Sequence, residues 1–192
     1  MELEKNTAAC LRAFHNVVES INAHKRLPDQ VFEQEIKNFR IFDSGYLTSS
    51  NFADRLREMI EVEAATCCCL LNYSQTDILE YQTPDFICLD RTTTPDQYKG
   101  LLWERHRLSG WNQAIDRFGC ASDRGGWCIY SESQGEIAII GFKSTEEISR
   151  YSKMLQAVSA VLPSEIIGDA GFLSYGRLLG SWKNGIRTHY HE

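Results

Sequence analysis

The chain has 192 residues, 43% of them hydrophobic, and its 26 acidic and 20 basic residues give a net charge of −6. This length suits one domain with a core large enough to be stable without disulfide or metal staples. The composition excludes disordered and collagen-like chains, and the acidic balance argues against a broad electrostatic contact with nucleic acid.

The amino-terminal segment carries no recognisable targeting signal. Residues 1–20 open with two glutamates and contain charges throughout, unlike the basic start and apolar run of a signal peptide. The longest strongly apolar stretches, 67–71 and 137–142, are far shorter than the roughly 20 residues that cross a bilayer. We therefore expect a cytoplasmic protein without a membrane contact.

The seven cysteines are odd in number and include no Cys-x-x-Cys pair. This pattern supports neither a disulfide framework nor a zinc ribbon, so reduced thiols are expected. Three cysteines are consecutive, at 67–69, inside an apolar segment. There they are expected to pack as small hydrophobic side chains.

Three helices are predicted in the first 63 residues. The first has apolar residues at helical spacing between Leu3 and Ile21, and Pro28 ends the pattern. A second is predicted through the apolar residues of 31–39, up to a turn at 43–45. The third begins after a Ser50 or Asn51 cap, and the apolar side chains between 52 and 60 form its buried edge.

From residue 65 the pattern changes to short strands. They are predicted at 66–73, 78–81 and 85–90, separated by turn residues. The segment 94–97 then forms the clearest helix start, because Thr94 caps the helix, a proline fills its first position and a glutamine closes a capping box. This helix is expected to loosen near 109–110, to resume through Phe118 and to end at Gly119.

A β-hairpin is predicted from 127 to 142, with a turn at 133–135. Its second strand is apolar on both faces, which is typical of a central strand covered on each side. Ser144 and Glu147 form another capping box, and an amphipathic helix is predicted from there to Pro163. A short helix is expected before the polar tail.

These elements predict an α+β fold with a mostly antiparallel central sheet of about five strands flanked by helices. We expect one domain over residues 1–192. Its parts are a helical region at 1–63, the sheet with its covering helices at 65–162, and a short helix and tail at 163–192.

Two residues are weighed as catalytic groups. His106 stands among charged residues, and Cys120 lies in an expected loop beside Asp123 and Arg124, where positive charge would favour a thiolate. A solvated helix face for His106 and packing for Cys120 are the competing interpretations. The familiar hydrolase, nucleotide and zinc motifs are missing from the sequence, and His189-x-His lacks a third ligand. No catalytic residue, metal or cofactor is therefore predicted.

Aromatic residues gather around the predicted helix at 95–118 and the hairpin that follows it. Large rings with polar tips commonly line pockets and interfaces, although packing in the core is the alternative. The candidate residues for binding a ligand or partner are Tyr98, Trp103, Trp111, Asp123, Arg124 and Trp127.

Residues 111–144, WNQAIDRFGCASDRGGWCIYSESQGEIAIIGFKS, resemble the last helix and hairpin of LuxR-type acyl-homoserine-lactone sensor domains. The likeness consists of a helix ending at Phe118-Gly119, a glycine opening a strand at Gly126, a turn glycine at Gly135, and an apolar strand followed by a long helix. The resemblance implies a GAF- or PAS-like α/β/α sandwich that senses a small molecule.

The chain departs from this family at the lactone site. The family's Asp-Pro pair has no counterpart, since Pro84-Asp85 and Pro95-Asp96 have the reverse order, and no ligand residue is carried over. The short, glycine-broken segment after Pro163 also does not suit the family's DNA-binding helix-turn-helix. The resemblance therefore implies a sensor or antagonist without an output domain.

Two kinds of binding function are predicted, ahead of an enzyme that would use Cys120 or His106. One is a non-enzymatic regulatory domain that binds a small apolar or aromatic ligand, or a protein, between the sheet and the helix at 95–118. The other is an immunity-type inhibitor that neutralises a toxin by direct binding, because negative charge steers a protein onto a basic partner. The expected partner is a small molecule or a protein, and the protein is either a basic toxin or a second copy of the chain in a homodimer. Binding to nucleic acid or to a membrane is not expected.

Overall fold

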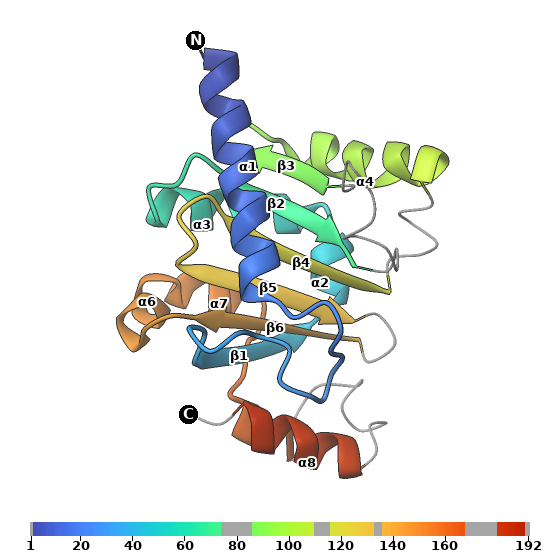
Figure 1. Ribbon diagram of the computed structural model, residues 1–192, viewed down its shortest axis with the longest axis vertical. Coiled ribbons are helices and arrows are strands. Elements are labelled where there is room, and N and C mark those ends of the chain that lie inside the picture. The colour runs from blue at the N-terminus through green and yellow to red at the C-terminus, as the bar shows by residue number, and fades with distance from the viewer. Residues whose placement is uncertain (1, 74–85, 110–115, 133–135, 168–179, 191–192) are drawn as a thin grey trace.

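The computed structural model describes residues 2–73, 86–109, 116–132, 136–167 and 180–190; the side chains of 2–6 and 103–109 are not described. Six strands form one open antiparallel sheet in the order β1-β6-β5-β4-β2-β3 (Figure 1). The predicted α+β class is confirmed, with six strands rather than about five. The strands are β1 Asn38–Asp43, β2 Cys67–Asn72, β3 Phe86–Asp90, β4 Arg117–Ser122, β5 Trp127–Glu132 and β6 Ile137–Phe142.

Helices cover both faces of the sheet, and α1 crosses one face while α2, α3 and α7 lie behind the other (Figure 1). In the described part of the chain, no helix is both long and apolar enough to cross a membrane. The helices are α1 Glu2–Ser20, α2 Gly45–Thr48, α3 Asn51–Val62, α4 Pro95–Ser109, α6 Thr145–Arg150, α7 Ser152–Ala157, α8 Gly180–His189 and the 3-10 helix η1 Pro163–Ile167.

The sheet separates two hydrophobic cores. The α3-side core lies between the sheet and α3, α4 and α7, and the α1-side core lies between the sheet and α1, η1 and α8. Successive residues of a strand point to opposite faces, so Ile140 of β6 enters the α3-side core and Ile139 enters the α1-side core. This confirms the prediction that the second hairpin strand is central and covered on both sides.

Helix α1 confirms the first predicted helix, but its most buried stripe consists of small residues. Ala9, Ala13 and Val17 are buried against the sheet, while Leu11 is 46% exposed. A Cβ atom added at Gly119 of β4 would lie 2.8 Å from Cγ1 of Val17. The helix therefore approaches the sheet closely where the strand has no side chain.

The helix predicted through residues 31–39 is wrong, because this segment is irregular, with a turn at 34–35, and leads into β1 at Asn38. Two of its backbone N–H groups bond to distant partners: Val31 N donates to the hydroxyl of Tyr190, which itself donates to the carbonyl of Asp29, and Glu33 N donates to the carbonyl of Ser20. Phe39 pairs with Gly141 of β6, where an added Cβ would collide with Ile36. Tertiary packing thus overrides the helix-like spacing of the apolar residues.

The predicted end of the helix at 95–118 is also wrong. Phe118 and Gly119 lie in β4, where Gly119 is paired with Leu71 of β2 and Tyr130 of β5. The continuation through Trp111 and the strand predicted at 78–81 lie outside the described residues. Pairing on both sides holds β4 in the middle of the sheet, so its glycine is not a helix stop.

Both predicted capping boxes are present. Thr94 N donates to Oε1 of Gln97 at 2.8 Å, and Gln97 N donates to the Thr94 hydroxyl at 3.2 Å. Ser144 and Glu147 form the equivalent pair at the start of α6. The helix predicted from there to Pro163 is divided at Tyr151 into α6 and α7, and the chain leaves helix after Ala157.

A disulfide joins Cys10 of α1 to Cys88 of β3, which corrects the expectation that all seven thiols are reduced. The two residues are 78 apart in sequence, and only the packing of α1 over β2 and β3 brings them together. The other five cysteines are free and buried, and the packing role predicted for residues 67–69 is confirmed.

Candidate functional site

Two of the aromatic residues predicted to bind a ligand lie in the hydrophobic core. Tyr98 and Trp127 are fully buried in the α3-side core, and the Tyr98 hydroxyl donates to the carbonyl of Leu47. Burial raises the pKa of Tyr98 well above its ordinary value, so the phenol stays neutral. Both side chains belong to the same large hydrophobic core, so their surroundings are those of packing.

Asp123, another predicted site residue, joins three elements. Its Oδ1 accepts hydrogen bonds from the backbone N–H groups of Thr66, at 2.7 Å, and Cys67, at 3.2 Å. Its Oδ2 pairs with Arg12 of α1 at 3.1 Å. The carboxylate thereby fastens the β4–β5 loop to the start of β2 and to α1, whereas the neighbouring Arg124 is exposed.

The structure describes only one of the remaining candidate residues in full. The side chains of Trp103 and His106 and the whole of Trp111 lie outside the described residues, so their roles stay predictions. Cys120 lies in β4, not in the predicted loop, and is fully buried. Burial, with a contribution from Cys68, raises the pKa of Cys120 well above its ordinary value, which keeps the thiol protonated and argues against a nucleophile there.

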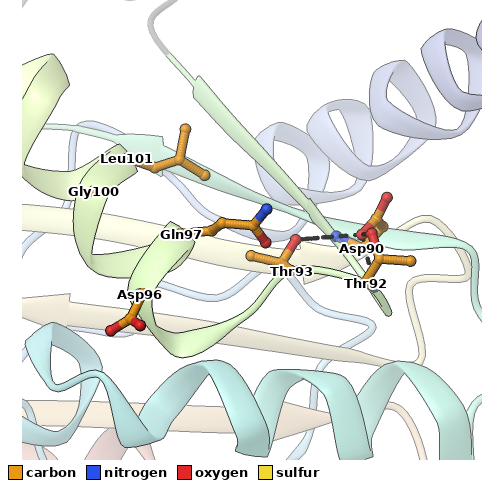
Figure 2. Close-up of a pocket in the computed structure, with 7 residues that line it drawn as sticks. All are labelled: Asp90, Thr92, Thr93, Asp96, Gln97, Gly100 and Leu101. Carbon is orange, nitrogen blue, oxygen red and sulfur yellow. Dashed lines mark hydrogen bonds between the residues drawn. The ribbon is translucent and has the colours of Figure 1, made fainter.

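A surface pocket of about 560 Å³ opens where β3 leads into α4 (Figure 2). The capping box at Thr94 turns the chain into the helix here and sets the first turn of α4 beside the end of β3. The pocket is lined by Asp90, Thr92, Thr93, Asp96, Gln97, Gly100 and Leu101.

Asp90 is the most ordered polar group of this pocket. Its Oδ1 accepts hydrogen bonds from the backbone N–H of Thr92 at 2.8 Å, the Thr92 hydroxyl at 2.7 Å and the Thr93 hydroxyl at 3.3 Å. Burial alone would raise the pKa of Asp90, but these bonds together lower it below the ordinary value. The half-buried side chain is therefore an ionised carboxylate in a fixed orientation.

The second oxygen of Asp90 is available to a ligand. Among the described residues, none donates a hydrogen bond to Oδ2 of this carboxylate. The guanidinium groups close by have other acceptors: Arg91 donates to the carbonyl of Ala65 at 2.7 Å, and Arg57 donates to the carbonyl of Thr93 at 3.3 Å and pairs with Asp54. Within the part of the chain that the structure describes, the negative charge of the pocket is thus not neutralised by a direct ion pair.

The remaining lining residues add an exposed carboxylate and an aliphatic side chain to the pocket. Figure 2 shows Gln97 between Asp90 with its threonines and Asp96, while Leu101 projects from the next turn of α4. Asp96 is exposed in the first helical turn, where a carboxylate is favoured by the helix dipole. A carboxylate beside an aliphatic side chain suits the charged head and apolar stem of lysine or arginine.

Sequence reasoning found the helix start at 94–97 but missed the pocket. The available signal was the run Asp90-Arg-Thr-Thr, because aspartate followed by hydroxyl residues two and three positions later is typical of a turn in which the carboxylate accepts local hydrogen bonds. That signal indicates an ordered carboxylate. The same signal does not indicate which residues of the following helix face the Asp90 carboxylate.

A second pair of carboxylates lies at the start of β5. Glu63 accepts a hydrogen bond from Gly126 N at 2.7 Å, and a Cβ at Gly126 would lie 2.6 Å from Glu63 Oε1 and 3.0 Å from Glu147 Oε1. Burial raises the pKa of Glu63, and the charge of Glu147 adds to this effect, so that together they outweigh the Gly126 bond. The folded protein therefore favours the protonated form of Glu63.

We expect Glu63→Gln to change how stability depends on pH. A raised pKa in the folded state means that the Glu63 carboxyl group favours folding below its ordinary value of 4.5, and that this contribution is lost as the pH rises through the raised value. The free energy of unfolding of the wild type minus that of Glu63→Gln should fall from pH 4.5 upward and then level off. Urea unfolding between pH 4 and 8 measures this difference. Glu61→Gln, an exposed substitution on the same helix, is the control, and a difference independent of pH would contradict the prediction.

No protein-family model, curated protein or solved structure matches the chain.

Proposed function

We propose that the protein is a non-enzymatic binding protein that inhibits or regulates a basic protein partner, and that the Asp90 pocket receives a lysine or arginine side chain of that partner. An immunity-type inhibitor of a basic toxin is the specific form of this function. The observation that supports it is the ionised, half-buried carboxylate of Asp90, which has one oxygen held by Thr92 and Thr93 and the other open to a ligand.

The energetics of such a contact favour a protein partner. A carboxylate that is already oriented loses little conformational freedom on binding, and a hydrogen bond between charged groups is worth about 1.5–3 kcal/mol. One such bond gives only weak affinity, so the pocket serves as one anchor within a wider interface. The net charge of −6 would raise the rate at which a basic partner arrives.

The small-ligand form of the predicted function has less support. It requires a cavity beside the aromatic residues at 95–127, whereas Tyr98 and Trp127 are packed in the core and neither lines the Asp90 pocket. A ligand site formed by Trp103 and Trp111 stays a prediction. A cytoplasmic location belongs to the proposal: the five free cysteines agree with a reducing compartment, whereas the Cys10–Cys88 disulfide does not.

The proposal is tested with two variants of equal charge. Asp90→Asn/Asp96→Asn alters the pocket, and Glu19→Gln/Glu61→Gln removes two exposed carboxylates elsewhere, so that each variant changes the net charge from −6 by +2 to −4. The probes are glycine-serine peptides with a central arginine, lysine or glutamine, titrated into ¹⁵N-labelled protein and followed by NMR.

Arginine and lysine peptides should shift the amide signals of Thr92, Thr93, Gly100 and Leu101. In the pocket variant their affinity should fall by about tenfold or more, as the loss of one charge-assisted hydrogen bond implies. The control variant should bind as the wild type does. Equal weakening in the two variants, or equal binding of the glutamine peptide, would contradict the proposal, since either result indicates unspecific attraction.

A further inference from the structure

Three cysteine sulfurs converge beneath α1 at the outer end of the sheet. Cys10 comes from α1, Cys67 begins β2 and Cys88 lies in β3, and their Sγ atoms all lie within 4.8 Å of one another. In the antiparallel register of β2 and β3, Cys67 is opposite Asp90, and Cys69 is opposite Cys88. Cys67 and Cys88 are therefore diagonal neighbours, and both lie on the face of the sheet that α1 covers. Helix, inner strand and edge strand each supply one sulfur.

The spacing of these sulfurs suits a single metal ion. Zinc binds thiolate sulfur at about 2.3 Å, so two sulfurs on one ion are at most about 4.6 Å apart. When the Cys10–Cys88 bond is opened, the three sulfurs start within 4.8 Å of one another, close to the spacing that one ion requires. Cys10 and Cys88 are half-buried, which gives a reductant and an ion access to the cluster, whereas Cys67 is 2% exposed and lies deeper.

The charges around the cluster favour a cation. Cys67 is buried, and the carboxylate of Asp123 accepts a hydrogen bond from its backbone N–H at 3.2 Å and pairs with Arg12 at 3.1 Å. These surroundings disfavour a bare thiolate, but a bound cation reverses the balance because it stabilises the deprotonated sulfur directly. Three thiolates with a divalent ion carry −1 and with a monovalent ion −2, and the buried surroundings favour the smaller net charge.

We propose that the reduced protein binds one thiophilic divalent metal ion, of which Zn²⁺ is the type, through the sulfurs of Cys10, Cys67 and Cys88. In the oxidised protein two of these sulfurs form the Cys10–Cys88 disulfide, and the site is closed to metal. The site is independent of the partner-binding function and uses none of the side chains that line the Asp90 pocket.

A dithiol reductant converts the oxidised protein to the reduced protein. The reductant transfers two electrons and two protons to the disulfide and is oxidised to a disulfide itself, so that one sulfur–sulfur bond is broken and one is formed. Cys10, Cys67 and Cys88 are then thiols. Their protons pass to solvent as the sulfur–metal bonds form.

The test compares the oxidised and reduced full-length protein. The protein is reduced with excess dithiothreitol, freed of it by gel filtration under argon, and titrated with Zn²⁺ against a chromophoric chelator, with Co²⁺ as a spectroscopic substitute. Reduction should raise the thiols titrated after denaturation from five to seven per chain. The reduced protein should bind one Zn²⁺ per chain and show thiolate-to-cobalt charge-transfer bands, and the oxidised protein should do neither.

Two variants test whether Zn²⁺ binds at the three-cysteine cluster. Cys67→Ala should weaken Zn²⁺ binding by the reduced protein at least about tenfold, because one of three ligands is lost. Cys128→Ala is the matched control, since it removes a buried thiol of the same α1-side core outside the cluster, and it should bind as the wild type does. Cys10→Ser, at a half-buried helix position, gives the same test if Cys67→Ala does not fold. Equal binding by oxidised and reduced protein, undiminished binding by the cluster variants, or no binding by the reduced wild type would overturn the proposal.

Discussion

Replacing Trp127 with alanine is expected to lower the free energy of unfolding by about 3–5 kcal/mol. The indole is among the largest fully buried side chains and begins β5, where Trp127 pairs with Phe142 of β6 and faces the α3-side core. Truncation removes the transfer free energy of the indole and leaves a cavity in the α3-side core. Urea unfolding followed by circular dichroism measures the loss.

The control for this variant is three residues away. Arg124→Ala removes an exposed side chain from the preceding loop and should change the free energy of unfolding by no more than about 0.5 kcal/mol. Trp127→Ala should also retain its affinity for the arginine peptide under conditions where it is folded, since Trp127 does not line the Asp90 pocket. A loss of stability below 1 kcal/mol, or a selective loss of peptide binding, would show that the indole acts in recognition instead of packing.

Adding a single methyl group at Gly119 is expected to destabilise the protein by about 1–3 kcal/mol. The Cβ of Gly119→Ala would lie 2.6 Å from Cδ1 of Ile21 and 2.8 Å from both Cγ1 of Val17 and Cε2 of Tyr73. All three neighbours belong to the α1-side core, so none has free space to move into. The variant must displace α1 from β4 or force side chains out of their preferred rotamers.

Gly100→Ala is the matched control with the opposite expected sign. No atom lies within 4 Å of the added Cβ, and alanine favours a helix interior over glycine, so this variant should gain up to about 1 kcal/mol. Combining Gly119→Ala with Val17→Ala should recover part of the loss, which a double-mutant cycle detects. If Gly119→Ala is as stable as the wild type, the close packing of α1 on β4 is incorrect.

Local signals in the sequence were sufficient for several elements. The capping boxes at Thr94 and Ser144 depend only on residues three positions away, and both are present in the structure. The hairpin of β5 and β6 was predicted for the same reason, because its two strands are neighbours in the chain. In each case the interaction that determines the structure is contained within the segment from which it was predicted.

The errors concern contacts between distant segments. Residues 31–39 have helix-like spacing, but β1 pairs with β6, which lies far along the chain. The Cys10–Cys88 pairing follows from the position of α1 over the sheet, which no spacing of seven cysteines determines. In the candidate site, the turn at Asp90 could be recognised in the sequence, whereas its opening beside Gly100 and Leu101 depends on the direction in which α4 leaves the turn.

The position of β1 at one edge of the sheet also has a consequence for synthesis of the chain. Its strand partner β6 ends at Phe142, and the one further bridge to this strand, within the described residues, joins Ile41 to Val161. A ribosome that adds about 5–20 residues per second therefore exposes the buried side chains of β1 for several seconds before their partner strand exists. Chains released before β6 is complete would present an unpaired apolar strand, the kind of surface that chaperones bind and that promotes aggregation.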